Sequence, residues 1–164
     1  MPGLADQLTE GSIASLEAAA PWRHQDAKTL ESSRRYGAAL YVYGFVAEIR
    51  LCCACYRALG LSVGTIIADE KRRAYEREAR KLNLMGREPH HILGWARYLV
   101  HVRSESKRQL QRRLSEPLLG HTEALYEQWR PRLRYKALTP TGAQLQIVRE
   151  AVQWLDSSYN ALWS

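Results

Sequence analysis

The chain has 164 residues and a formal net charge of +7, and 46% of its residues are apolar. This size suits one domain with a core that needs no disulfide or metal staple. So many apolar residues with few Gly and Pro exclude a disordered chain. The longest apolar run, residues 38–47, is shorter than the roughly 18 residues of a membrane span, and the first residues show no signal-peptide pattern. We therefore expect a cytoplasmic protein without membrane contact.

The N-terminal residues 1–20 are predicted to form a separate arm. They contain one weak helical piece with a short apolar stripe, and Pro21 is expected to end it. Pro21 then suits the first turn of a short helix over residues 22–33. The sequence therefore predicts two units, an arm at 1–20 and a helical bundle at 21–164.

Residues 34–59 are the stretch around which the rest of the chain is organised. Their apolar side chains cover nearly the whole circumference of a helix, which is typical of a helix surrounded by other helices. Gly37 and Gly44 lie seven residues apart on one face, where another helix backbone could approach closely. Downstream, we expect helices over residues 66–85, 90–114, 122–129 and 142–163, with a break at Pro117 and Gly120. Because no strand-like alternation occurs, the prediction is an all-α, single-domain bundle of about five to six helices around this central helix.

Two features of the central helix indicate a ligand or a partner. Glu48 has no cation one turn away on its own helix, so a buried carboxylate there must find a partner on another helix or become neutral. A structural role bonded to another helix and a role in a site both remain open for Glu48. Arg34 and Arg35 precede the positive end of the helix dipole, where cations are unfavourable unless an anion is present.

All three cysteines, Cys52, Cys53 and Cys55, lie in the central helix. Their odd number and close spacing exclude a disulfide framework, and no His or Cys cluster completes a zinc pattern. We expect buried, reduced thiols, and we expect neither a metal nor a cofactor.

The positive charge is confined to the middle of the sequence. Residues 71–113 hold 13 Lys and Arg against 4 Asp and Glu, whereas residues 1–70 are slightly acidic and residues 114–164 are neutral. Such a concentration is typical of a surface that meets a phosphate-bearing partner, although a solvated helix face gives the same pattern. The candidate basic surface residues are Arg72, Arg73, Arg108 and Arg112.

The central helix resembles the signature helix of HEPN-domain proteins, which often reads A-x-Y-L-A-G-Y-x-V-E-x-x-L-K. The matching residues are Ala39, Tyr41, Val42, Gly44, Phe45, Ala47 and Glu48. His91 near the start of a later helix is similar to a further family feature, as are Trp129 and the pair Arg134–Tyr135 before a final helix with Ala and Trp. The likeness covers roughly residues 22–163.

The resemblance implies a bundle of four to five helices that is commonly dimeric. In many members, RNA is cleaved without a metal by an Arg that is followed after four to six residues by a His. This chain lacks that spacing, and Arg97 with His101, three residues between them, come closest. A basic, solvated helix face is the other interpretation of this pair. Further candidates for ligand or phosphate binding are Arg34, Arg35, Glu48, His91, Arg134 and Tyr135.

Three functions follow as hypotheses. The first is a module of a prokaryotic defence or toxin–antitoxin system that binds RNA, a nucleotide or a protein partner, and the defence context rests on the resemblance alone. The second is a metal-independent endoribonuclease with an atypical Arg97/His101 site. The third is a structural subunit or adaptor of a larger complex, which docks through the glycine face or the charged helix at 66–85. Self-association or a protein partner is expected in each case.

Overall fold

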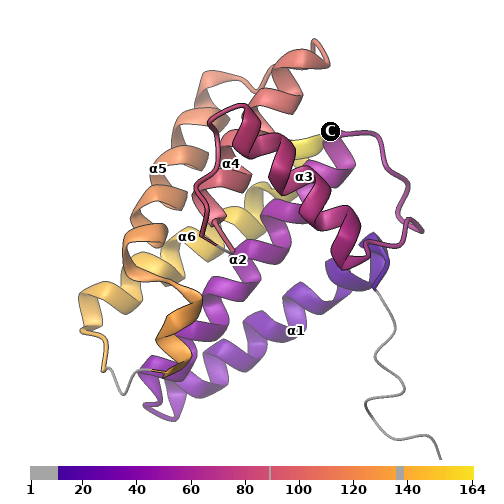
Figure 1. Ribbon diagram of the computed structural model, residues 1–164. Coiled ribbons are helices and arrows are strands. Elements are labelled where there is room, and N and C mark those ends of the chain that lie inside the picture. The colour runs from indigo at the N-terminus through magenta and orange to yellow at the C-terminus, as the bar shows by residue number, and fades with distance from the viewer. Residues whose placement is uncertain (1–10, 89, 136–138) are drawn as a thin grey trace, which may run out of the picture.

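Six α-helices and one short 3-10 helix make up most of the part of the chain that the structure describes (Figure 1). The computed structural model describes residues 11–88, 90–135 and 139–164, without the side chains of residues 134 and 135. No strand occurs among the described residues, which confirms the predicted all-α helical bundle. The elements are α1 (Ile13–Ser32), α2 (Tyr36–Ala58), α3 (Asp69–Lys81), α4 (Ile92–Glu105), α5 (Arg112–Gln128), η2 (Pro131–Tyr135) and α6 (Gly142–Trp163).

Helix α2 lies at the centre of the bundle, as its sequence predicts. It packs against α1, α4 and α6, and α5 closes the far side by packing on α4 and α6. Tyr43, Leu51 and Tyr56 are fully buried along it, and burying side chains of this size is the main force that holds the helices together. By length and composition alone α2 could cross a membrane, but most of this apolar stretch is buried inside the bundle.

Helix α1 is continuous from Ile13 to Ser32, so the expected break at Pro21 is wrong. Pro21 removes one backbone hydrogen bond, and a proline inside a helix costs about 3 kcal/mol. Packing offsets this cost, because Ile13, Ala20 and Ala27, on both sides of the proline, are buried against the bundle. Residues 13–20 are therefore part of the bundle rather than of an arm, and residues 1–10 lie outside the described residues.

The break between α4 and α5 also differs from the prediction. Helix α4 ends at Glu105, and Lys107 follows in the left-handed region with a φ of 56°. Helix α5 begins at Arg112 and runs through Pro117 and Gly120, where a break was expected. Leu118, Thr122 and Leu125 are buried on one face of α5, and this packing keeps the helix continuous past the proline.

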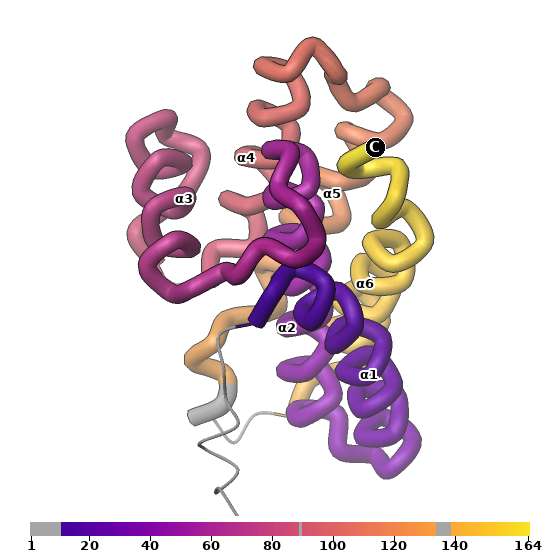
Figure 2. The backbone as a smooth tube through the Cα atoms, turned by 90° about the vertical axis from the view of Figure 1, so that its right-hand side faces the viewer, coloured from indigo at the N-terminus to yellow at the C-terminus, as the bar shows by residue number. Residues whose placement is uncertain are grey.

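Helix α3 is the most loosely attached element. Figure 2 shows it standing beside the bundle, and among the helices it packs mainly on α4. Only Glu76 and Ala79 are buried on it, while the ring of Tyr75 lies 5.5 Å from that of Tyr56 on α2. It begins later and ends earlier than the predicted 66–85, and Asn83, with a φ of 57°, turns the chain after its C-terminal end. Polar contacts therefore contribute much of what fixes α3 in place.

At Gly44, the glycine face of α2 is filled by a side chain, not by a helix backbone. A Cβ atom at Gly44 would overlap the indole ring of Trp129. The indole Nε1 donates a hydrogen bond to the carbonyl oxygen of Tyr41 at 3.1 Å. At Gly44 this face is consequently closed to a partner helix, contrary to the docking surface expected from the sequence.

The three cysteines are free and buried, as predicted. Burial raises the pKa of the Cys53 thiol to about 12, and it raises the pKa values of Cys52 and Cys55 well above their ordinary range. The Cys55 thiol donates to the carbonyl oxygen of Trp95 at 3.3 Å. The thiols thus behave as small apolar groups of the core.

Candidate functional site

The lone carboxylate of Glu48 finds its partners outside α2. Glu48 is only 4% exposed, and both of its carboxylate oxygens are in contact with His90. Arg72 from α3 forms an ion pair with the same carboxylate. We call Glu48, Arg72 and His90 the pocket trio. The sequence argument that a buried Glu48 needs a partner on another element is confirmed.

The contact between His90 and Glu48 fixes the tautomer of the imidazole. His90 Nδ1 lies 2.8 Å and 2.9 Å from the two carboxylate oxygens. An ionised carboxylate only accepts hydrogen bonds, so Nδ1 must carry the hydrogen. Nε2 of a neutral His90 is then a free base, and the His90 side chain is 35% exposed to solvent. A histidine that a carboxylate orients in this way is suited to proton transfer.

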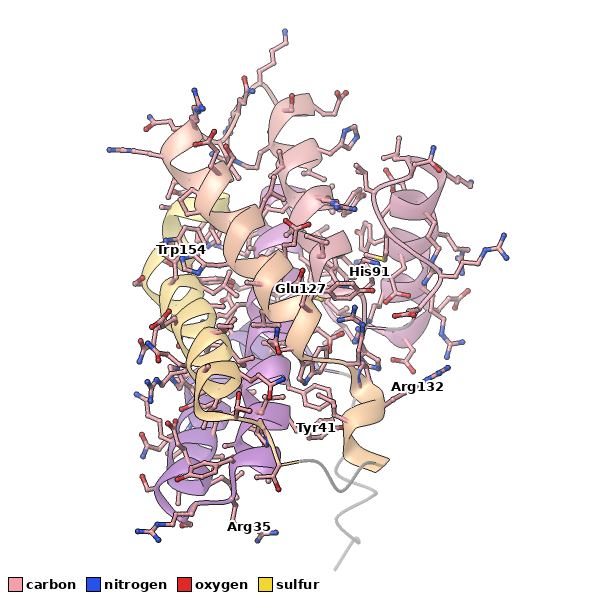
Figure 3. The ribbon with its side chains drawn as sticks, turned by 90° about the vertical axis from the view of Figure 1, so that its left-hand side faces the viewer. Arg35, Tyr41, His91, Glu127, Arg132 and Trp154 are labelled. Atoms are coloured by element: carbon pink, nitrogen blue, oxygen red, sulfur yellow. The ribbon has the colours of Figure 1, made fainter. Side chains whose placement is uncertain are left out.

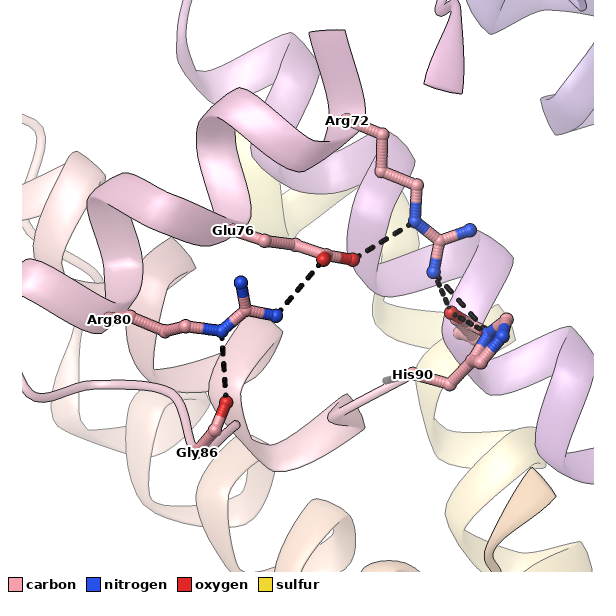
Figure 4. Close-up of polar contacts among 6 residues, drawn as sticks. Arg72, Glu76, Arg80, Gly86 and His90 are labelled. Carbon is pink, nitrogen blue, oxygen red and sulfur yellow. Dashed lines mark hydrogen bonds and ion pairs between the residues drawn. The ribbon is translucent and has the colours of Figure 1, made fainter. Parts of the chain in front are cut away.

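Arg72 joins the pocket trio to a ladder of ion pairs along α3. Its Nε donates to Glu76 at 3.2 Å, and Arg80 donates to the other oxygen of Glu76 at 3.2 Å (Figure 4). Arg80 also donates to the carbonyl oxygen of Gly86 at 3.2 Å, which holds the loop that carries His90. Burial acts to lower the pKa of Arg72, but the carboxylates of Glu48 and Glu76 beside it act in the opposite direction, and the pKa is raised. The guanidinium therefore stays charged.

An open pocket of about 300 Å³ lies over the pocket trio. It is lined by Asp69, Arg72, Arg73, Glu76 and His90. The carboxylates of Glu48 and Glu76 already neutralise Arg72, whereas Arg73 is exposed and has no ion pair among the described residues. Arg73 and a protonated His90 are thus the groups in this pocket that can attract an anion. The remaining carboxylate, Asp69, stands at the first turn of α3.

The position of the His90 side chain depends on an unusual backbone conformation at this residue. Its φ of 57° lies in the left-handed region, which costs energy for a residue with a side chain. The ring of Phe45 on α2 packs edge-on against the imidazole, with 6.1 Å between ring centroids. The contacts with Glu48 and Phe45 offset the cost of this conformation.

His91, one of the candidates for ligand binding, makes structural contacts. It is the N-cap of α4, and its Nδ1 accepts a hydrogen bond from the backbone N–H of Gly94 at 2.9 Å. Its ring stacks on Tyr126 with 4.4 Å between centroids. Burial lowers the pKa of His91, and Arg130 and Arg97 act in the same direction, so the ring remains neutral as its capping bond requires. Glu48 therefore pairs with His90, not with His91.

Arg34 and Arg35 do not line the pocket. Arg34 has a φ of 59° in the turn before α2, and Arg35 is the N-cap of α2 without a side-chain capping bond. Figure 3 shows Arg35 at the far end of the bundle from His91. Arg134 and Tyr135 end η2, and their side chains lie outside the described part of the structure.

Arg97 and His101 lie on α4 and do not line the pocket. Arg97 is exposed, and the ring of His101 stacks on Tyr98 at 6.4 Å between centroids. The basic surface residues form two groups rather than one. Arg72 and Arg73 belong to α3, whereas Arg108 lies in the α4–α5 turn and Arg112 begins α5. Figure 2 shows α3 at one side of the bundle and that turn at its top.

Sequence reasoning missed three residues of the site, His90, Asp69 and Glu76. A signal existed for Glu76, because Arg72, Glu76 and Arg80 are spaced four residues apart and share one face of α3. A signal also existed for His90, as one of two adjacent histidines that could serve Glu48. The choice between them depends on the left-handed backbone at residue 90, which no sequence pattern indicated.

No family model, curated protein or solved structure matches this chain. Among the described residues, no group of three or more His, Cys, Asp or Glu side chains is arranged to hold a metal ion. The chemistry of the site must therefore be argued from its own residues.

Proposed function

We propose that this chain is an RNA-binding helical module whose contact surface is the pocket formed by α3 and the loop that carries His90. The observation that carries the proposal is the convergence of Arg72, Arg73 and His90 on one open pocket. These residues belong to the only third of the sequence with excess positive charge. A phosphodiester would meet Arg73 directly and would be stabilised further when His90 is protonated.

The resemblance of α2 to the HEPN signature helix agrees with this proposal. Family membership, self-association and a role in a prokaryotic defence or toxin–antitoxin system are parts of the proposal that rest on the resemblance alone. A nucleotide carries the same kind of phosphate group as RNA. It is a smaller ligand whose binding can be compared with that of RNA. An adaptor role remains the alternative, with the exposed face of α3 as its docking surface.

Binding is tested with labelled single-stranded RNA by fluorescence anisotropy over a series of salt concentrations. We expect affinity to fall steeply with salt, and Arg73→Gln should flatten the slope of log affinity against log salt by about 0.7, the value for one contact to single-stranded nucleic acid. Arg23→Gln is the matched control, since Arg23 is an exposed arginine of α1 that pairs with Asp26. Binding that is independent of salt, or equal effects of both variants, would contradict the proposal.

A second function, RNA cleavage, is favoured by the contact between His90 and Glu48. In this reaction His90 Nε2 takes the proton of a ribose 2′-hydroxyl, and the oxygen forms a bond to phosphorus. The bond from phosphorus to the 5′ oxygen breaks, leaving a cyclic phosphate, and the departing oxygen takes a proton from water. Glu48 would stabilise the imidazolium that forms, and Arg73 would face the charge that develops on the phosphate.

Cleavage is tested by incubating nuclease-free protein with labelled single-stranded RNA in the presence of a chelator. We expect His90→Gln and Glu48→Gln to leave the RNA intact, while Arg97→Ala and His101→Ala cut it as the unaltered protein does. The reverse result would move the site to Arg97 and His101 on α4. Intact RNA with the unaltered protein would leave binding as the only function of the pocket.

A further inference from the structure

A row of aromatic side chains leads along α2 to the pocket. The rings of Tyr41 and Phe45, one helical turn apart, lie 4.8 Å from each other, and Phe45 lies 6.1 Å from His90. All three side chains are partly exposed, unlike the fully buried Tyr43 on another face of the same helix. We call Tyr41, Phe45 and His90 the aromatic row. It ends at the imidazole that also lines the pocket.

Buried side chains of the bundle hold the aromatic row in place. Trp129 is fully buried, occupies the space above Gly44 and packs edge-on against Phe45 at 5.5 Å. Its Nε1 donates to the carbonyl oxygen of Tyr41. At the other end of the row, Glu48 fixes the imidazole of His90. A flat ligand that stacks here would therefore lose little free energy in ordering the protein side chains.

Cations flank the aromatic row at both ends. Arg72 and Arg73 stand at the pocket end. At the other end, Figure 3 shows Tyr41 beside η2, from which the exposed Arg132 points outward. Partly exposed aromatic rings with basic groups on both sides are the arrangement by which proteins bind single-stranded nucleic acid. The rings stack on bases, and the cations track the phosphates.

We propose that the aromatic row receives the bases of a single-stranded nucleic acid whose phosphate lies in the pocket. This inference rests on the proposed function and deepens it, because it makes the bases, and not the phosphate charge alone, a determinant of affinity. Duplex RNA, whose bases are stacked on each other, should bind more weakly than a single strand of equal length.

The test separates base stacking from charge with two oligomers of equal length and charge. One is a 2′-O-methyl oligouridine, which cannot be cleaved, and the other is a chain of tetrahydrofuran phosphates without bases. Anisotropy is measured for the unaltered protein and for Tyr41→Leu and Phe45→Leu, which keep apolar volume but cannot stack. Trp22→Leu is the control, since Trp22 is an aromatic residue of α1 that is 75% exposed.

We expect the oligouridine to bind more tightly than the abasic chain, and Tyr41→Leu to weaken only the oligouridine, by about fivefold or more. Thermal unfolding of each variant identifies any loss of fold at Phe45, and Tyr41→Leu carries the test where Phe45→Leu unfolds. Equal affinity of the unaltered protein for both oligomers would overturn this inference and leave the proposed function intact. Equal losses on both oligomers in Tyr41→Leu would overturn it too. Absence of salt-dependent binding to either oligomer would overturn the proposed function itself.

Discussion

Helix α2 carries two clusters that are built from the same three kinds of side chain. On one face, Glu48 contacts Arg72 and His90. On another face, Asp156 of α6 accepts from Arg50 at 2.6 Å and contacts Nδ1 of His24 on α1. We call His24, Arg50 and Asp156 the core trio. Each trio consists of a carboxylate, an arginine and a histidine that uses Nδ1.

The two trios differ in which member is buried. In the pocket trio the carboxylate side chain is 5% exposed, whereas Arg72 and His90 are 29% and 35% exposed. In the core trio the carboxylate is 22% exposed, and Arg50 and His24 are 14% and 10% exposed. The partly exposed side chain of His90 lines an open pocket, while Nε2 of His24 is buried without a hydrogen-bond partner among the described residues.

The two trios show that the same three residue types do not by themselves make a functional site. A histidine oriented by a carboxylate can transfer a proton only when its second nitrogen reaches a ligand. In the core trio that nitrogen is sealed among α1, α2 and α6, so the trio can only hold helices together. The same reasoning predicts opposite results when each carboxylate is removed.

The largest effect is expected for Asp156→Asn in the core trio. The substitution leaves the charge of Arg50 and the imidazole of His24 buried without a counter-charge, and breaking a buried pair of this kind costs about 3 kcal/mol. Urea unfolding should show this loss, while the folded fraction binds RNA as before. Glu150→Gln, at an exposed carboxylate of the same helix, is the control. A loss no larger than that of the control would mean that the core trio does not stabilise the fold.

A smaller loss, about 1–2 kcal/mol, is expected for Glu48→Gln in the pocket trio. In this variant Arg72 keeps its hydrogen bond to Glu76. Both Arg72 and His90 are partly exposed, so their polar groups can form hydrogen bonds with water. RNA affinity should rise and its salt dependence should steepen, because Arg72 is no longer neutralised by Glu48. Glu70→Gln in the first turn of α3 is the control for a lost surface charge. A loss of stability equal to that of Asp156→Asn would show that the two trios are alike and that both are structural.

Much of the fold could be predicted from the sequence, because hydrophobic periodicity reports directly on burial. The circumference of apolar residues at 34–59 predicts a central helix, and α2 at Tyr36–Ala58 confirms it. The two errors at Pro21 and Pro117 have one cause. A proline removes one hydrogen bond, and the packing of residues on both sides of it can exceed that local cost.

The candidate site was less accessible to sequence reasoning. The need of Glu48 for a partner follows from its position, but the identity of the partner depends on the loop between α3 and α4. Asn83 and His90 both adopt positive φ values in that loop, which are uncommon for residues other than glycine, although Asn and His adopt them more often than most. The charge run at 71–113 likewise predicts a basic surface. It does not indicate that Arg72 turns inward to Glu48 while Arg73, its neighbour, faces solvent.

His91, the capping histidine next to the pocket trio, makes the stability of the fold depend on pH. Burial lowers the pKa of His91 below its ordinary value of 6.5, so the unfolded chain binds a proton more readily than the folded protein. Stability is therefore lost as pH falls from above 6.5 through the lowered pKa of the folded state. His91→Asn keeps a capping oxygen and cannot titrate. The difference in unfolding free energy between the two proteins should change over this range, and a constant difference would contradict the assignment.

The smallest effect on stability is expected for Arg112→Gln, outside both trios. Arg112 and its partner Glu116 are 87% and 61% exposed, and an exposed pair four residues apart on a helix contributes at most about 0.5 kcal/mol. Arg112→Gln is useful as a comparison for Arg73→Gln. The two arginines belong to the same basic third of the sequence, but Arg73 lies on α3 and Arg112 at the start of α5, in different parts of the molecule. We expect Arg73→Gln to weaken RNA binding and Arg112→Gln to leave it nearly unchanged. Equal weakening by both would mean that RNA follows a longer path from α3 to the α4–α5 turn, because no single pocket reaches both ends.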